Sequence, residues 1–203
     1  MFTIIEENQN SIVIALSETE VGKVILPCNL VWVNAKTGER EDLFGKGEEP
    51  SVEKESKALQ YANTINNLFP TFIRNDIWQT EDGKTHKMIV MERLYILPTL
   101  HFDLETRKLM LSEFVIRMKE LHDKYFVHGD FCRPTNYYTR GNFEWMFKNI
   151  VQTEKGLRLI DTGFSKYLPN EKNTRMLVSC LLEERQDIKL FRHYYLEEGN
   201  EKQ

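Results

Sequence analysis

The stretch LHDKYFVHGD occupies residues 121–130, and the stretch LRLIDTG occupies residues 157–163. Ahead of Asp130, residues 105–124 predict an amphipathic helix, because apolar side chains recur every three or four positions. Ahead of Asp161, residues 149–152 and 157–160 flank the turn sequence TEKG, a pattern typical of a short hairpin. The sequence therefore predicts one aspartate just after a long helix and another at the end of a hairpin strand.

The first half of the chain predicts a small antiparallel sheet with one helix. Five segments are β-branched or aliphatic and are separated by turn residues: 2–6, 12–16, 21–26, 73–80 and 86–91. Ser51 can begin a helix that runs to about Ile65. Residues 37–50 are Gly-rich and charged, so we expect an exposed loop there. The second half is expected to be mainly helical.

Composition indicates a folded protein with no unusual surface. Of the 203 residues, 41% are hydrophobic and 29% charged, close to globular averages. The net charge of -4 argues against a nucleic-acid partner, and the 3 cysteines are too scattered for a disulfide framework. No basic leader and no membrane-length apolar run is present. We therefore expect a cytoplasmic protein with no membrane partner.

The two motifs resemble the HRD and DFG elements of protein kinases, with His-Gly-Asp and Asp-Thr-Gly in their places. The resemblance covers about residues 2–197 and is nearest to compact bacterial, phage and effector kinases. It implies an α+β, two-lobed, protein-kinase-like fold in a single domain. Residues 1–94 would form a five-stranded antiparallel N-lobe with one helix and the hinge, and residues 95–203 a truncated, mainly helical C-lobe. It also implies ATP and Mg²⁺ as cofactors, a protein as substrate, and room for an activating protein partner. For an effector kinase it implies, as the alternative to a cytoplasmic protein, one delivered into a host cytoplasm.

On this resemblance, Asp130 would orient the acceptor hydroxyl, and Asn149 and Asp161 would hold Mg²⁺. The hairpin between Asn149 and Asp161 supports this choice, because it brings the two residues back side by side. The alternative loop asparagine is Asn136, in the sequence Pro-Thr-Asn. Choosing Asn149 implies an aromatic-rich insertion at about residues 131–148, where a protein substrate would dock.

The resemblance also assigns a lysine and a glutamate. Lys23, in EVGKVI, matches the third-strand lysine that contacts the phosphates, and Glu55 matches the helix glutamate that pairs with it. Lys36 is a rival, since it lies 19 positions before Glu55, which is a more usual interval in the family than the 32 positions from Lys23. Lys23 is preferred because three strands then fit in the usual order, and Lys-Thr-Gly at Lys36 is typical of a turn.

Two further segments match the family pattern. Met91 would be the gatekeeper at the end of the fifth strand, and the backbone from Glu92 to Leu94 would be available to adenine. Residues 185–191 resemble the start of the buried helix whose aspartate, here Asp187, accepts hydrogen bonds from the backbone of the catalytic loop.

The sequence also departs from the family. Residues 7–11 lack the Gly-rich clamp, His-Gly-Asp lacks the arginine that receives an activation-loop phosphate, and Asp-Thr-Gly lacks the aromatic residue. Two other functions compete: a small-molecule kinase of the aminoglycoside phosphotransferase type, and a pseudokinase that binds a partner without turnover. Retention of Asp130, Asn149, Asp161 and a Lys–Glu pair favours an enzyme, a minimal protein kinase acting on Ser/Thr or Tyr hydroxyls.

Overall fold

The computed structural model describes residues 3–7, 11–26, 31–33, 40–42, 51–80, 82–131, 147–168 and 170–197. The chain divides into two compact units. The first unit is Met1–Ser56 with Phe72–Arg93, and the second is Lys57–Thr71 with Leu94–Gln203. Sequence analysis placed all of residues 1–94 in one lobe, whereas Lys57–Thr71 groups with the second unit.

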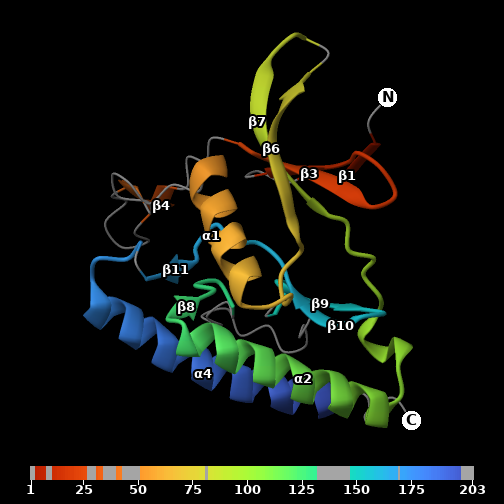
Figure 1. The fold of residues 1–203 in the computed structure, drawn as a ribbon, viewed down its shortest axis with the longest axis vertical. Helices are drawn as coiled ribbons and strands as arrows, with labels where there is room; N and C mark the ends of the chain where they lie inside the picture. The colour runs from red at the N-terminus through yellow and green to blue at the C-terminus, as the bar shows by residue number, and fades with distance from the viewer. Residues whose placement is uncertain are drawn as a thin grey trace. The chain divides into compact units, whose positions relative to one another are not determined.

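The first unit is built on a five-stranded antiparallel sheet in the order β1-β2-β3-β7-β6 (Figure 1). Its strands are β1 (Thr3–Glu7), β2 (Ser11–Ala15), β3 (Glu20–Ile25), β6 (Phe72–Gln79) and β7 (Thr85–Glu92). The five strands expected from the sequence are therefore confirmed, with small shifts at their ends. Strand β3 lies in the centre of the sheet, between β2 and β7.

Alternation along the strands separates a core face from the face that carries Lys23. Ile14 and Val90 both pair with Gly22, and this face holds a buried apolar cluster of Ile12, Ile14, Val24, Met88 and Val90. A Cβ at Gly22 would lie 2.7 Å from Met88 Sδ, so a larger residue there would require the Met88 side chain to move. Lys23, the next residue along β3, points to the opposite face of the sheet.

One strand of a short two-stranded sheet lies in the segment that was expected to be an exposed loop. Strand β4 (Val31–Val33) pairs antiparallel with β5 (Arg40–Asp42). The expectation of a loop over residues 37–50 is therefore wrong for Arg40–Asp42, and the other residues of that range lie outside the described part. A charged three-residue strand has no apolar alternation by which to recognise it, because backbone pairing alone defines it.

Three α-helices are described: α1 (Val52–Ile65), α2 (Leu104–Asp123) and α4 (Thr174–Glu197). A short 3₁₀ helix, η1 (Thr99–His101), precedes α2. Side-chain oxygens cap all three α-helices: Ser51 accepts from Lys54 N–H, Asp103 from Thr106 N–H and Asn173 from Met176 N–H. The expected helices at 51–65 and 105–124 are confirmed, whereas α4 begins at Thr174, well before the expected start at residue 185.

The second unit combines α2 and α4 with two short strand pairs, β8 (Phe126–Val127) with β11 (Lys166–Tyr167) and β9 (Ile150–Thr153) with β10 (Gly156–Leu159). The expected hairpin around residues 153–156 is confirmed. Aromatic rings fill the core, and Phe191 lies within 6.5 Å of Phe114, Phe131, Phe147 and Tyr195, measured between ring centroids. The protein is thus α+β, as the sequence predicts.

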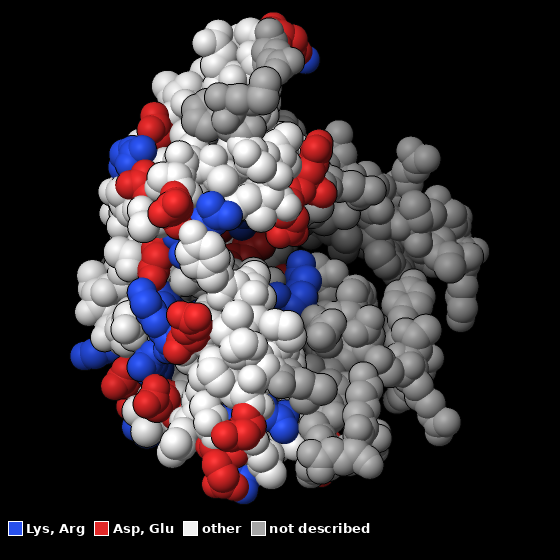
Figure 2. All heavy atoms as spheres, turned by 90° about the vertical axis from the view of Figure 1, so that its right-hand side faces the viewer, with Lys and Arg blue, Asp and Glu red and all other residues white. Residues whose placement is uncertain are grey.

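No helix in the described part of the chain is long and apolar enough to cross a membrane. On the face shown in Figure 2, Lys and Arg side chains are interspersed with Asp and Glu. Among the coloured residues of that face, charges of both signs are mixed.

Candidate active site

The loop after β8 carries His128, Gly129 and Asp130, and the imidazole of His128 determines its path. His128 Nε2 donates to the carbonyl oxygen of Ile160 at 2.8 Å, and Nδ1 accepts the N–H of Asp130 at 3.2 Å. This pattern requires the Nε2–H tautomer. The ring is also stacked on Phe69, with 5.8 Å between centroids. His128 therefore ties the loop of Asp130 to the residue that precedes Asp161.

A buried glutamate on α4 holds the same loop from behind. The Glu184 carboxylate, in a residue 3% exposed, accepts the N–H of His128 at 2.9 Å and that of Gly129 at 3.2 Å. It also accepts from Nε2 of His122, which is buried on α2, at 3.0 Å. The sequence pattern predicts that Asp187, one helical turn further along, accepts the hydrogen bonds from this loop, and it does not single out Glu184. The signal was present, since Glu184 shares the buried face of α4 with Leu177 and Phe191.

Gly129 is required by a backbone crossing. Its φ is +81°, in the left-handed region, and a Cβ built there would lie 2.2 Å from the carbonyl oxygen of Phe164. The crossing is held from the other side as well, because Ser165 Oγ donates to the His128 carbonyl at 3.1 Å. A residue with a side chain, arginine included, therefore cannot fit at position 129 without moving the Phe164 backbone.

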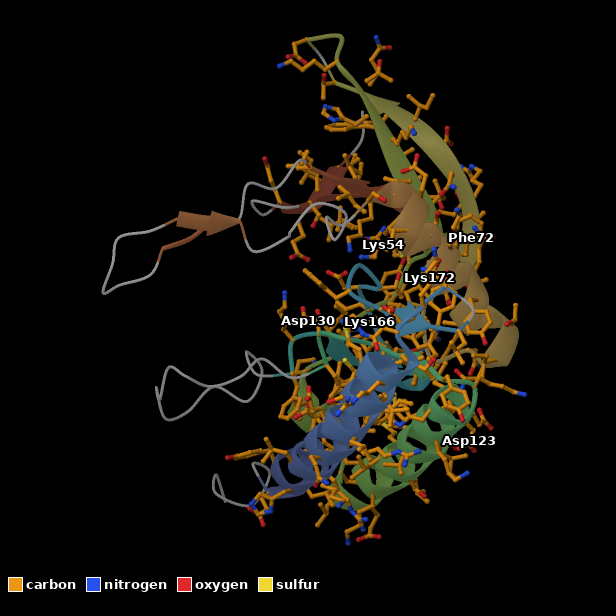
Figure 3. The ribbon with its side chains drawn as sticks, turned by 90° about the vertical axis from the view of Figure 1, so that its left-hand side faces the viewer. Lys54, Phe72, Asp123, Asp130, Lys166 and Lys172 are labelled. Carbon is orange, nitrogen blue, oxygen red and sulfur yellow. The ribbon has the colours of Figure 1, made fainter. Side chains whose placement is uncertain are left out.

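The Asn149 side chain and the β9–β10 hairpin bring together Asp130, Asn149 and Asp161. Asn149 Nδ2 donates to the carbonyl oxygen of Asp130 at 2.8 Å and to its Oδ2 at 3.0 Å. The N–H of Ile160 donates to the carbonyl oxygen of Asn149 at 2.9 Å, so Asp161 is the next residue beyond this pair. Asp130 is labelled in Figure 3, in the loop that follows β8. The structure brings together the three residues that sequence analysis proposed.

Asp161 has an unusual backbone. Its φ is +64°, and its Oδ1 accepts the N–H of Gly163 at 3.0 Å. Aspartate tolerates the left-handed region better than most residues, yet the conformation costs energy, and such residues cluster at functional sites. The turn that it makes ends the β10 side of the hairpin and redirects the chain toward Phe164.

The donor set of Asn149 and Asp161 fits Mg²⁺. The two hydrogen bonds from Nδ2 orient the Asn149 amide and leave Oδ1 as the atom that could hold a metal, while Asp161 supplies a carboxylate. Magnesium prefers such oxygen ligands and usually takes one or two from the protein, with water and substrate phosphates completing its shell. Among the described residues, no group of three or more His, Cys, Asp or Glu side chains could hold a metal ion by itself.

In the first unit, Lys23 and Glu55 form a buried ion pair. Lys23 Nζ lies 2.7 Å from Glu55 Oε1, and the side chains are 12% and 3% exposed. Glu55 stands on the first turn of α1, where the helix dipole favours a carboxylate. The rival Lys36 lies outside the described residues.

The proposed adenine contacts lie at and just after the end of β7. Met91 and Glu92 are the last two residues of β7, where Met91 pairs with Val21 and Glu92 with Glu20. Leu94 comes two residues later and is the first residue of its segment of the second unit. Their backbone groups therefore begin the link between the two units along the chain.

Most of the insertion proposed at residues 131–148, including Asn136, lies outside the described residues. Of its described residues, Phe131 and Phe147 are core rather than surface: they are 3% and 2% exposed, with 6.2 Å between their ring centroids, whereas Lys148 is exposed. Phe147, one of the aromatic residues thought to serve docking, instead packs against Phe191.

No protein-family model matches the chain, and no curated protein matches it. Among solved structures it is similar to Rio2 kinase from Chaetomium thermophilum, determined as a complex with ADP/Mg²⁺ and phosphoaspartate. The identity is 15% and the TM-score 0.48, over 90% of this chain and 55% of that one. The chain thus spans about half the length of that kinase, and a likeness this distant does not assign a function.

Replacing Gly129 with alanine should destabilise the protein far more than replacing Gly83, which has nearly the same φ of +82° but no atom within 4 Å of a built Cβ. Gly83→Ala should cost only the backbone term of about 1–2 kcal/mol. Gly129→Ala should cost roughly 2 kcal/mol more, because the Phe164 carbonyl must move. Urea unfolding of both variants measures the difference, and equal costs would contradict the crossing.

Asp187→Asn should make the protein more stable at neutral pH. Burial, followed by the charges of Glu184 and Glu183, raises the pKa of Asp187 from 3.8 to about 6. Between these values the folded state holds the proton and the unfolded state does not, so stability falls as pH rises through that window. After discounting for solvent at a half-exposed site, the gain at pH 7.5 should be about 1 kcal/mol, and near zero below pH 4.

Urea unfolding at the two pH values measures this gain. Asp123→Asn is the matched control, because a hydrogen bond from Lys119 lowers the pKa of that exposed carboxyl. The control should give no gain at pH 7.5. A pH-independent effect of Asp187→Asn would show that ionisation of this carboxyl does not lower the free energy of unfolding.

Proposed function

We propose that the chain is an ATP- and Mg²⁺-dependent phosphotransferase, a minimal protein kinase that acts on Ser, Thr or Tyr hydroxyls. The observation that carries the proposal is the double hydrogen bond from Asn149 to Asp130, with Asp161 held next to Asn149 by the hairpin. Phosphoryl transfer needs a carboxylate to orient the acceptor and oxygen ligands for the metal at a short distance from it. These residues supply both in one hydrogen-bonded group.

In the reaction, Asp130 accepts a hydrogen bond from the acceptor hydroxyl and orients it for in-line attack on the γ-phosphorus. The bond from the acceptor oxygen to phosphorus forms as the bond between that phosphorus and the β–γ bridging oxygen breaks. ADP leaves, and the hydroxyl proton passes to Asp130. Asn149 keeps the Asp130 carboxylate in place, because it is bonded to the backbone and side chain of the same residue.

Magnesium, held by Asn149 and Asp161, would supply positive charge for the developing charge on the phosphates. Lys23 is the second source of positive charge in the proposal. Its ammonium is held by the buried Glu55 carboxylate, so it is already desolvated and oriented before nucleotide binds. The backbone from Glu92 to Leu94, with Met91 as gatekeeper, would receive adenine.

The acceptor and the partners belong to the proposal too. A protein hydroxyl is the acceptor class, docked by the residues of the 131–148 insertion, and an activating protein partner would act on the same kinase. A pseudokinase that binds without turnover and a small-molecule kinase of the aminoglycoside phosphotransferase type are the competing outcomes. Phosphotransfer assays with protein extracts and with small alcohols separate the three.

Asp130→Asn should abolish turnover and leave ATP·Mg²⁺ affinity unchanged, since Asp130 serves the acceptor rather than the nucleotide. Loss of a positioned base costs about 10²- to 10⁴-fold in rate. Asp161→Ala should instead weaken the magnesium dependence of ATP binding as well as turnover. Isothermal titration with and without Mg²⁺, beside transfer from radiolabelled ATP, measures both quantities.

Asp123→Asn, at an exposed aspartate at the end of α2, is the control and should change neither quantity. Full activity in Asp130→Asn would mean that His128-Gly129-Asp130 is only a turn. Absence of ATP binding in the unmodified chain would favour the pseudokinase.

Lys23→Met should lower turnover at least about 10²-fold, because it removes a preorganised cation from the phosphates. Lys87→Met is the matched control: it also removes a Lys–Glu pair between β7 and α1, but that pair with Glu53 is exposed. Lys36→Met tests the rival lysine in the same assay. Inactivity of Lys36→Met with an active Lys23→Met would reverse the assignment.

A further inference from the structure

Strand β6 forms one edge of the sheet in the first unit, and among the described residues no strand pairs with its outer side. Five consecutive residues of this strand are exposed. They include Ile73 at 40% and Ile77 at 63% exposure. In Figure 1 the β6–β7 hairpin extends well past the ends of β1 and β3. A long, exposed edge strand that bears apolar side chains is a template for pairing with another strand.

The hydrogen bonds of β6 show which residues face the open edge. The N–H of Thr80 donates to the carbonyl oxygen of Lys84 at 2.9 Å, so Thr80 faces β7. Because backbone groups alternate in an antiparallel pair, Asp76 and Arg74 also face β7, whereas Ile77 and Asn75 face outward. The N–H of Ile77 agrees with this assignment, since it donates to Asp76 Oδ1 at 2.8 Å. A bulge between Phe72 and Arg74 limits the regular alternation to residues 74–79.

The side chains around Asn75 repeat the same chemistry in reverse order. Arg74 and Asp76 flank Asn75, and Ile73 and Ile77 follow at the next positions outward. When two copies of β6 pair antiparallel about Asn75, each Arg74 lies opposite the other copy's Asp76, and each Ile73 lies opposite an Ile77. The two Asn75 residues then form a hydrogen-bonded pair, as their outward-facing backbone groups require.

The charges at these positions are accessible. Arg74 Nε lies 3.2 Å from Asp76 Oδ2 and Arg74 Nη1 lies 3.1 Å from Glu20 Oε2, with Arg74 46% and Asp76 44% exposed. The N–H of Ile77 and then the guanidinium of Arg74 hold the pKa of Asp76 below its usual range. A partner strand would therefore meet one positive and one negative side chain at fixed positions on either side of Asn75.

We propose that β6 is a dimerisation edge whose occupant is a second copy of this chain, paired antiparallel about a two-fold axis through Asn75. The same strand in reverse places opposite charges at both flanking positions, which is the self-complementarity that a two-fold interface requires. Opposite-charge cross-strand pairs stabilise such pairing, and like charges oppose it. The contact joins the two five-stranded sheets into one continuous sheet and does not depend on the proposed function.

Sedimentation equilibrium of the full chain tests the proposal, with association expected by about 0.3 mM because the interface is small. Asn75→Pro should give a monomer, since it removes an outward N–H and leaves the N–H groups that face β7 in place. Circular dichroism and thermal unfolding check that this variant is folded. A wild-type chain that stays monomeric over this range, or a folded Asn75→Pro variant that still dimerises, overturns the proposal.

Charge-reversal variants provide the second test. A purely structural effect of each substitution would not be reversed when the two variants are mixed. Arg74→Asp and Asp76→Arg should each weaken self-association about tenfold or more, since each sets like charges opposite one another. Mixing the two variants should restore association, because the mixed pair has opposite charges at both positions. Failure of the mixture to associate while the wild type dimerises overturns the register about Asn75.

Discussion

The candidate site depends on the hydrogen bonds that the buried carboxylate of Glu184 accepts. This carboxylate accepts two backbone N–H groups of the loop that carries Asp130, and it connects that loop to α2 through His122. A buried carboxylate must have its hydrogen bonds, because an unpaired charge in the interior typically costs several kcal/mol. The loop conformation and the packing of α4 against α2 therefore stabilise each other. The position of Asp130 follows from this arrangement.

The second constraint is the hydrogen bond between Asn149 and Asp130, which does not depend on the length of chain between these two residues. Asp130 and Asn149 are 19 positions apart in sequence and are directly hydrogen-bonded. The cost of closing a loop grows only with the logarithm of its length. The hairpin then carries the chain from Asn149 to Asp161 with short-range pairing. An insertion between Asp130 and Asn149 is therefore compatible with the site, because both of its ends are anchored by Phe131 and Phe147 in the core.

The strands, the two helices and the hairpin could be predicted from the sequence because their patterns are local. The sheet strands alternate, α2 repeats every three or four residues, and residues 153–156 have turn chemistry. The choice of Lys23 over Lys36 rested on the expected strand order and that of Glu55 on a family pattern, and the structure shows Lys23 and Glu55 as an ion pair. Glu184 could not be found in the same way. A motif match pointed to Asp187, and choosing between two carboxylates one turn apart requires the phase of a helix whose start was misplaced.

The close approach of Gly129 to the Phe164 carbonyl oxygen restricts the residue type at position 129 but not at position 164. The contact at Gly129 is with a carbonyl oxygen, which every residue type at position 164 would present in the same way. Side-chain changes at Phe164 leave that oxygen where it is, whereas any side chain at Gly129 collides with it. Substitution of every residue type at position 129 should therefore leave only glycine functional, whereas this contact places no such limit on the side chain at position 164.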